Sequence, residues 1–321
     1  MLEGIFLFTS YALYQTILWN FEFRFRMNIP IVFTFDKRIL LGAAVAIKSL
    51  LACAKDTTSY NVFVFHPDIE DEDIKAFSEL TKETRHTIEF IKTPPSRFRG
   101  LPKNNKSWTE IVYYRFLSPE LLPQFDKVIY SDVDVLFKQD LEDLYKEDMS
   151  EYELAAVRAE RNSADMIGHK YFPENKKEFV YWSGLLLINS AKMRANDTLN
   201  RIIETAKVFN SRLKFFDLDA MNLACDNIKA LPFKYVTLEE IYESKNVENC
   251  HDWNFLKSVY TKEMLEDARD NPMIVHYAGV LGKPWHRKYP PQEWQEYANA
   301  IPSRLNRRTF RDLRKRFFSK V

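Results

Sequence analysis

The chain has 321 residues, of which 46% are hydrophobic and 28% charged, as in a folded globular protein rather than a disordered or collagen-like chain. Its 46 lysines and arginines nearly balance 45 aspartates and glutamates, and the net charge of +1 argues against a dedicated nucleic-acid-binding protein. The three cysteines form no CxxC pair, which argues against a disulfide framework or a cysteine-rich zinc site. GxGxxG and GxxxxGK[ST] are both absent, so any nucleotide must bind without those phosphate loops.

Residues 1–28 form an apolar N-terminal extension. Between Gly4 and Phe21 there are 18 residues without a charge, which just reaches the length of a membrane span. The stretch also contains polar residues, and no basic region precedes it as in a secretory signal. Three interpretations stay open: a span that leaves the rest of the chain in the cytosol, an amphipathic or packed segment, and a dispensable extension ahead of a start at Met27.

From residue 29 onward, short apolar runs alternate with amphipathic stretches. Runs rich in β-forming residues predict strands at 29–35, 61–66, 87–91, 127–130, 154–157 and 184–188. Amphipathic stretches predict helices at 40–54, 69–80, 108–117 and 199–209. Such alternation is typical of an α/β protein with a mostly parallel sheet and helices on its faces.

Two aspartates, Asp132 and Asp134, directly follow the fourth predicted strand. In open α/β sheets, ligands bind just outside the carboxyl ends of the strands. Side chains at i and i+2 share one face of a strand, and a turn at the strand end still lets both reach one cation. Their hard oxygen ligands suit Mg²⁺ or Mn²⁺. An isolated DxD is equally compatible with a solvated loop, so the motif needs a second observation.

The second motif is His-Tyr-Ala-Gly-Val-Leu-Gly-Lys-Pro-Trp at 276–285, after a short predicted strand at 273–275. The imidazole of His276 suits Mn²⁺ as a third ligand. Glycine lets the backbone approach a ligand closely, and Lys283 meets a phosphate as a point charge. A packed His-Tyr cap followed by a structural Pro-Trp turn explains the same segment without chemistry, and that alternative stays open.

Together the two motifs resemble the retaining glycosyltransferases of family 8, and further similar segments run in the same order from Ile29 to Trp294. The resemblance implies a single domain of the Rossmann-like glycosyltransferase A fold over residues 29–300. Five further segments carry it, namely the opening strand at 33–36, the helix after it at 44–51, the Tyr-x-Arg region at 114–116, the Asn-x-Gly segment at 182–189 and the Asp-Gln-x-x-x-Asn segment at 217–222.

The resemblance also implies a role for each matching residue. The divalent metal would be held by Asp132, Asp134 and His276, with Asp132 also near the ribose or sugar. Thr34 and Asp36 would bind the nucleoside of the donor, and Gly279 and Lys283 its diphosphate. The sugar of the donor would be bound by Arg115, Asp217 and Asn222. Of these, Arg115, Asp217 and Lys283 are the predicted catalytic residues. The alternative for Arg115, Asp217 and Asn222 is an ordinary place on a helix surface.

Four positions depart from the family pattern. The usual glutamine after Asp217 is Leu218, and the first asparagine of the Asn-x-Gly segment is Trp182. A carboxylate expected near the end of the fifth predicted strand is replaced by Ala159, with Glu160 next to it. The spacing between Gly279 and Lys283 contains one extra residue, Gly282. These changes bear on sugar specificity and on the geometry around Lys283, whereas the metal-binding set is intact.

The resemblance therefore predicts an enzyme that moves a hexose, glucose or galactose, from a UDP-sugar to a saccharide or lipid-linked saccharide hydroxyl with retention of configuration. The first acceptor to consider is an envelope glycan such as lipopolysaccharide or lipooligosaccharide. Because Leu218 removes one candidate nucleophile, front-face attack is favoured over a covalent intermediate. Two alternatives come from other classes: a metal-dependent phosphatase, and a non-catalytic glycan- or membrane-binding protein on the same fold.

The last 21 residues, 301–321, carry eight basic residues and one acidic residue, whereas the rest of the chain is mildly acidic. Aromatic and aliphatic residues recur at near-helical spacing, and Pro302 and Ser303 are typical of a helix start. A basic amphipathic tail suits an anionic membrane surface, which predicts a peripheral enzyme on the inner face of the cytoplasmic membrane. A disordered solubilising tail or a contact for another protein is the alternative.

Overall fold

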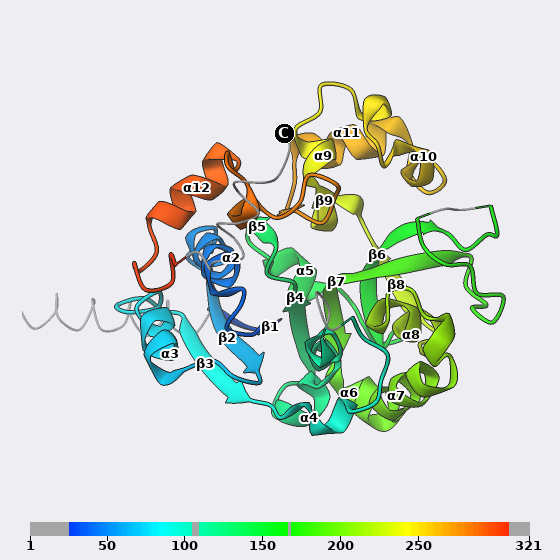
Figure 1. The fold of residues 1–321 in the computed structure, drawn as a ribbon, viewed down its shortest axis with the longest axis horizontal. Coiled ribbons are helices and arrows are strands. Elements are labelled where there is room, and N and C mark those ends of the chain that lie inside the picture. The colour runs from blue at the N-terminus through cyan, green and yellow to red at the C-terminus, as the bar shows by residue number, and fades with distance from the viewer. Residues whose placement is uncertain (1–25, 105–108, 166–167, 308–321) are drawn as a thin grey trace, which may run out of the picture.

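The six strands predicted between residues 29 and 188 pair with one further strand into a seven-stranded sheet in a computed structural model that describes residues 26–104, 109–165 and 168–307 (Figure 1). The strand order is β3-β2-β1-β4-β7-β6-β8. Only β7 runs antiparallel to its neighbours, β4 and β6, and the other neighbouring pairs are parallel. The strands are β1 Met27–Thr34, β2 Thr58–His66, β3 Thr87–Lys92, β4 Lys127–Ser131, β6 Leu154–Arg161, β7 Phe179–Asn189 and β8 Ile228–Leu231.

Both faces of this sheet are covered, which explains why its central strands read as continuous apolar runs. In β1, Ile31 and Phe33 pack into the hydrophobic cluster that includes α2 (Leu40–Ala52) and α12 (Gln292–Asn299). Val32 lies between them and packs into the opposite cluster, which includes α7 (Thr198–Val208) and α8 (Asp217–Ala224). The mostly parallel α/β architecture predicted from the sequence is confirmed.

A second, three-stranded sheet lies beside the carboxyl end of β4. Its strands are β5 (Val135–Phe137), β10 (Ile274–His276) and β9 (Thr237–Leu238), in the order β5-β10-β9. The strand β10 runs antiparallel to β5, with His276 opposite Val135, and parallel to β9. This pairing joins two chain segments that are more than a hundred residues apart.

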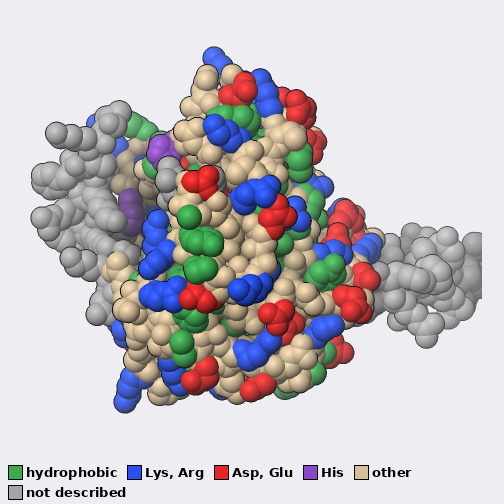
Figure 2. All heavy atoms as spheres, turned by 90° about the vertical axis from the view of Figure 1, so that its right-hand side faces the viewer, with side chains coloured by type: hydrophobic (Ala, Val, Ile, Leu, Met, Phe, Trp, Pro, Cys, Tyr) green, Lys and Arg blue, Asp and Glu red, His purple; other side chains and the backbone are tan. Residues whose placement is uncertain are grey.

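The remaining elements are short and connect or cover the two sheets. The other α-helices are α3 Asp71–Ser78, α4 Ser118–Leu121, α5 Glu142–Lys146, α6 Ser190–Ala195, α9 Glu239–Tyr242, α10 Trp253–Leu256 and α11 Lys262–Asp270. The 3₁₀ turns are Pro95–Phe98, Glu110–Phe116, Asn210–Arg212, Phe233–Val236, Val247–Asn249 and Pro284–His286. On the face shown in Figure 2, acidic and basic side chains are interspersed rather than segregated.

Two predicted elements differ from the structure. The helix expected at 108–117 is a 3₁₀ helix over Glu110–Phe116, and Trp108 lies outside the described residues. A helix start at Pro302 and Ser303 is wrong, because residues 301–307 form turns with Ile301 and Leu305 buried in the core. The Nε of Arg304 donates to Asp73 at 2.5 Å, so this part of the basic tail belongs to the folded body.

The rest of the tail, 308–321, and most of the N-terminal extension, 1–25, lie outside the described residues. The possible span at Gly4–Phe21 therefore stays a prediction. Among the residues that are described, no helix has the length and apolar character needed to cross a membrane.

Gly42, in the first turn of α2, lies against the ring of Trp285. A Cβ at this position would lie 2.5 Å from Trp285 Cζ3. We expect Gly42→Ala to lower the free energy of unfolding by ~1–2 kcal/mol, because overpacking costs more than the helix propensity gained. In a Trp285→Leu background the same change should be neutral or stabilising by up to ~1 kcal/mol. Urea unfolding of the four proteins measures this, and an equal effect in both backgrounds would contradict it.

Candidate metal and donor site

The predicted metal ligands meet where the two sheets join. The large sheet strand β4 ends at Ser131 and the small sheet strand β5 begins at Val135, so the DxD motif forms the turn between them. The backbone N–H of Asp132 donates to the carbonyl of Gly184 in β7 at 2.8 Å, and the N–H of Tyr277 donates to the carbonyl of Asp134 at 2.8 Å. These backbone bonds fix both aspartates next to His276 at the end of β10.

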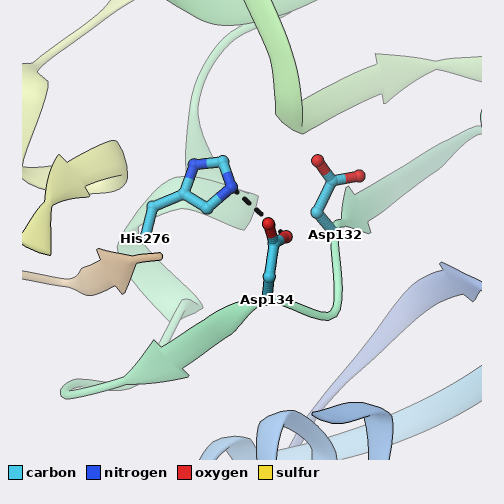
Figure 3. A group of neighbouring side chains, drawn as sticks. All are labelled: Asp132, Asp134 and His276. Atoms are coloured by element: carbon cyan, nitrogen blue, oxygen red, sulfur yellow. Dashed lines mark ion pairs between the residues drawn. The ribbon is translucent and has the colours of Figure 1, made fainter. Parts of the chain in front are cut away.

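The three side chains point toward a common space, as Figure 3 shows. Their ligand atoms all lie within 4.8 Å of one another, and Nε2 of His276 is 3.3 Å from Oδ1 of Asp134. Within the described part of the chain, that buried Nε2 has no hydrogen-bond partner. Two carboxylates and one imidazole whose Nε2 makes no hydrogen bond among the described residues form a donor set suited to Mn²⁺, and oxygen ligands alone also suit Mg²⁺. The residues present therefore fit a divalent metal.

Gly184 closes the floor of this site, a role that the sequence analysis did not identify. A Cβ at position 184 would lie 2.9 Å from Cε1 of His276 and 3.1 Å from Oδ2 of Asp132. Only glycine leaves room for both ligands to approach the strand. The glycine is visible in the Trp-Ser-Gly sequence at 182–184. Its role follows only from the position of β7 relative to β4 and β10.

Arg115 connects the metal ligands to Asp217 from beneath. Its guanidinium is buried, with Nη2 3.2 Å from Oδ1 of Asp132 and Nε 3.2 Å from Oδ2 of Asp217. It also lies over the ring of Tyr130 at 4.6 Å and donates to the carbonyl of Ser183. Burial opposes its charge, but Asp132 and then Asp217 outweigh it and raise the pKa of Arg115 above its ordinary value. This guanidinium is a permanent positive charge inside the site.

Asp217 begins α8 and is 6% exposed. Oδ2 of Asp217 accepts a hydrogen bond from the Ser183 hydroxyl at 3.0 Å. Burial raises the pKa of Asp217 to about 6, Arg115 opposes the rise and Asp132 adds to it. The carboxylate of Asp217 is thus held in place by two partners.

The residues predicted to bind the nucleoside, Thr34 and Asp36, lie at the carboxyl end of β1, beside β4. The Thr34 hydroxyl is 3.3 Å from the Tyr130 hydroxyl, which itself donates to Oδ1 of Asp132 at 2.5 Å. Asp36 accepts from Nε of Arg38 at 2.7 Å. Tyr130 therefore links Thr34, in the expected nucleoside-binding part of the site, to Asp132, in the expected metal-binding part. Nothing in the sequence pattern set Tyr130 apart from the other residues of its strand.

Asn222 has a full set of internal partners. Its Nδ2 donates to the carbonyls of Tyr181 and Leu218 at 2.8 Å and 2.9 Å, and its Oδ1 accepts from the N–H of Tyr181 at 2.9 Å. These bonds tie α8 to β7. In this structure the amide positions Asp217 rather than facing open space.

Lys283 reaches Asp134 from the loop after β10. Its Nζ donates to Oδ2 of Asp134 and to the carbonyl of Tyr277, the latter at 3.0 Å. Burial alone would raise the pKa of Asp134, but Lys283 and His276 hold it well below its usual range. The extra residue Gly282 has a φ of +76°, a left-handed conformation that glycine adopts without strain.

The remaining departures from the family pattern lie on β6, β7 and α8. Trp182 packs against the rings of His169 and Phe233, with centroid distances of 6.5 Å and 5.9 Å. Leu218 and Ala159 are buried. The carboxylate of Glu160 turns toward His169, whose backbone N–H donates to it.

Replacing Gly184 tests the metal-binding geometry directly. We expect Gly184→Ala to weaken Mn²⁺ binding without nucleotide by about tenfold or more, because the new methyl displaces His276 or Asp132, and loss of a well-placed ligand typically costs that much. Gly279→Ala is the matched control, since a Cβ there meets nothing within 4 Å. Mn²⁺ titration followed by electron paramagnetic resonance gives both affinities. Equal affinity of wild type and Gly184→Ala would show that the site lies elsewhere.

Comparison with known proteins finds similarity along most of the chain. Residues 30–289 match the family model "Glycosyl transferase family 8". A lipopolysaccharide 1,2-glucosyltransferase of Escherichia coli is 26% identical over 83% of this chain and 74% of its own length. A lipopolysaccharide 1,3-galactosyltransferase of Salmonella typhimurium is 25% identical over 89% of this chain and 82% of its own length.

Solved structures show the same fold. The galactosyltransferase LgtC, solved with donor and acceptor sugar analogues, superposes with a TM-score of 0.69 at 23% identity over 85% of this chain and 96% of its own. The bifunctional glycosyltransferase WbbM gives 0.68 at 18% identity, and this chain spans 52% of it. The glycosyltransferase A fold expected from the sequence is thereby confirmed. Because a family model matches most of its length, the chain belongs to glycosyl transferase family 8.

Proposed function

We propose that the chain is a retaining hexosyltransferase that moves glucose or galactose from a UDP-sugar to a saccharide hydroxyl. The observation that carries the proposal is the convergence of Asp132, Asp134 and His276 at the junction of the two sheets, with Arg115 joining them to Asp217. Neither alternative activity has a comparable observation in its favour. The metal ligands follow the fourth strand rather than the first, unlike the nucleophile of typical DxD phosphatases, and a non-catalytic protein has no need of an intact metal set.

The donor would lie across the carboxyl ends of β1 and β4. Thr34 and Asp36 face its nucleoside, while Gly279 and Lys283 lie beside its diphosphate. A divalent cation held by Asp132, Asp134 and His276, Mn²⁺ or Mg²⁺, would neutralise charge on the departing diphosphate. Arg115 and Asp217 position the sugar hydroxyls, and Asn222 supports them by fixing α8 on β7.

Front-face attack is the mechanism that these residues favour. Leu218 stands where the family usually has an amide, and its side chain is buried and unreactive. Asp217 is engaged by Arg115 and by the Ser183 hydroxyl, so its carboxylate is not free to act as a nucleophile. The protein would then contribute positioning and charge stabilisation rather than a covalent intermediate.

An envelope glycan such as lipopolysaccharide or lipooligosaccharide is the proposed acceptor. Two of the related proteins are named for lipopolysaccharide glucosyl and galactosyl transfer. Such an acceptor is lipid-linked, so a peripheral position on the inner face of the cytoplasmic membrane would bring enzyme and acceptor together. The basic residues after Arg307 supply the charge for that contact.

Asp134→Asn tests the proposed reaction. We expect it to lower Mn²⁺-dependent release of UDP from a UDP-hexose by at least ~100-fold, because it removes a charged ligand that supports the leaving group. Asp126→Asn, at the opposite end of β4 and 85% exposed, is the matched control and should retain activity. A panel of UDP-hexoses assayed for UDP release identifies the donor. Undiminished turnover by Asp134→Asn would refute the assignment, and metal-dependent hydrolysis of simple phosphate esters would favour a phosphatase.

The tail prediction now has a sharper boundary. Residues 308–321 hold six basic residues and one acidic residue, and the residues that the structure describes end at Arg307. A chain that stops after Arg307 should keep UDP-hexose hydrolysis but lose most co-sedimentation with phosphatidylglycerol vesicles at low salt, since each basic residue contributes about 1 kcal/mol there. A full-length chain with Arg314, Lys315 and Arg316 changed to glutamine separates charge from length. Equal vesicle binding by the truncated and full-length chains would refute docking through the tail.

A further inference from the structure

The ammonium of Lys283 contacts Asp134, one of the three predicted metal ligands. It donates to Oδ2 of Asp134, on the carboxylate whose Oδ1 faces His276 at 3.3 Å. Its second partner is the carbonyl of Tyr277 at 3.0 Å. The Asp134 side chain is 15% exposed and that of Lys283 is 34% exposed, so the pair lies at the mouth of the site.

We propose that Lys283 is the resting counter-ion of Asp134 and that it changes partner when the enzyme is loaded. In the free protein its ammonium neutralises Asp134, and with a divalent cation on Asp134 it turns to the donor diphosphate. The inference rests on the proposed function, because it assumes that a cation and a nucleoside diphosphate occupy this site.

The need for such a counter-ion follows from the charges around the site. Asp132 and Asp217 share the buried guanidinium of Arg115, which lies on their side of the site. Asp134 has Lys283 and His276 as its ion-pair partners among the described residues. A largely buried carboxylate without a partner is strongly unfavourable. Lys283 therefore meets the requirement for positive charge that a cation would otherwise meet.

The loop that carries Lys283 is fixed at both ends and open at its tip. Tyr277 is bound to Asp134 through its backbone, and Trp285 packs against Gly42 in α2. Between these anchors, Val280 and Leu281 are exposed, at 66% and 53%. A Cβ on Gly279 or Gly282 would meet nothing within 4 Å. The tip has few contacts to lose, so Lys283 can exchange partners while the anchors stay in place.

Partner exchange makes cation and nucleotide binding cooperative. Without nucleotide, a cation must displace Lys283 from Asp134. With UDP present, the diphosphate offers the displaced ammonium a new partner, so each ligand strengthens binding of the other by the same factor. Removing the ammonium should therefore have opposite effects on the two ligands: tighter binding of the cation alone and weaker binding of UDP.

The test measures Mn²⁺ affinity by electron paramagnetic resonance, with and without UDP, in wild type and Lys283→Met. We expect Lys283→Met to bind Mn²⁺ alone about tenfold more tightly. We expect UDP to strengthen Mn²⁺ binding by a factor that is about tenfold smaller in the variant than in wild type, because only the direct attraction between cation and diphosphate remains. Lys262→Met is the matched control, because Lys262 on α11 forms an ion pair with Glu248 at 2.8 Å in another part of the molecule. This substitution should leave both Mn²⁺ affinities unchanged. Lys283→Gln, which keeps polar contacts, should shift both values in the same direction and serves if Lys283→Met does not fold.

The outcomes separate this inference from the proposed function. Equal or weaker binding of Mn²⁺ alone by the Lys283 variants would overturn the counter-ion role, even if wild type binds Mn²⁺ and UDP cooperatively. An undiminished effect of UDP in those variants would overturn the partner exchange. Failure of wild type to bind Mn²⁺ with or without UDP would instead overturn the proposed function.

Discussion

The pairing of β10 with β5 is the constraint on which the candidate site depends. The DxD motif lies in the three-residue turn between β4 and β5. Because β10 pairs with β5, the end of β10 is placed next to that turn. The bond from Tyr277 N–H to the carbonyl of Asp134 then places His276 beside both aspartates. Ordinary strand pairing thus completes the candidate metal-binding set by bringing His276 to the DxD motif from a distant part of the chain.

Charge compensation shapes the rest of the site. Three carboxylates, those of Asp132, Asp134 and Asp217, lie within a largely covered region, and such a cluster is tolerated only with compensating charge. Arg115 provides that charge from the protein side, where the ring of Tyr130 and the carbonyl of Ser183 hold its guanidinium in place. Lys283 provides it from the solvent side. The guanidinium of Arg115 is buried, whereas the ammonium of Lys283 is on a loop and its side chain is 34% exposed.

Fold class was accessible from the pattern of residues, and the resemblance of the motifs to family 8 implied the glycosyltransferase A fold. Continuous apolar runs between amphipathic stretches indicated a covered, mostly parallel sheet, and the structure has one. The same pattern gave no sign that β7 runs antiparallel or that β10 joins a second sheet, because strand direction and pairing are long-range properties. The helix expected around Glu110–Phe116 is a 3₁₀ helix, and the turns at 301–307 owe their burial to Ile301 and Leu305 rather than to local propensity.

The sequence by itself determined which residue types are available for the proposed metal and donor binding, and their order along the chain. It singled out Asp132, Asp134, His276 and Lys283 because their side-chain types and their order along the chain resemble the motifs of family 8, and both can be read without a structure. Only the tertiary structure decided which of them touch. Gly184 was selected by the close approach of two ligands, Tyr130 by its reach between β1 and β4, and Asn222 by its bonds to β7. Each of these roles is set by packing between segments distant in sequence, and such packing leaves no local signature in the chain.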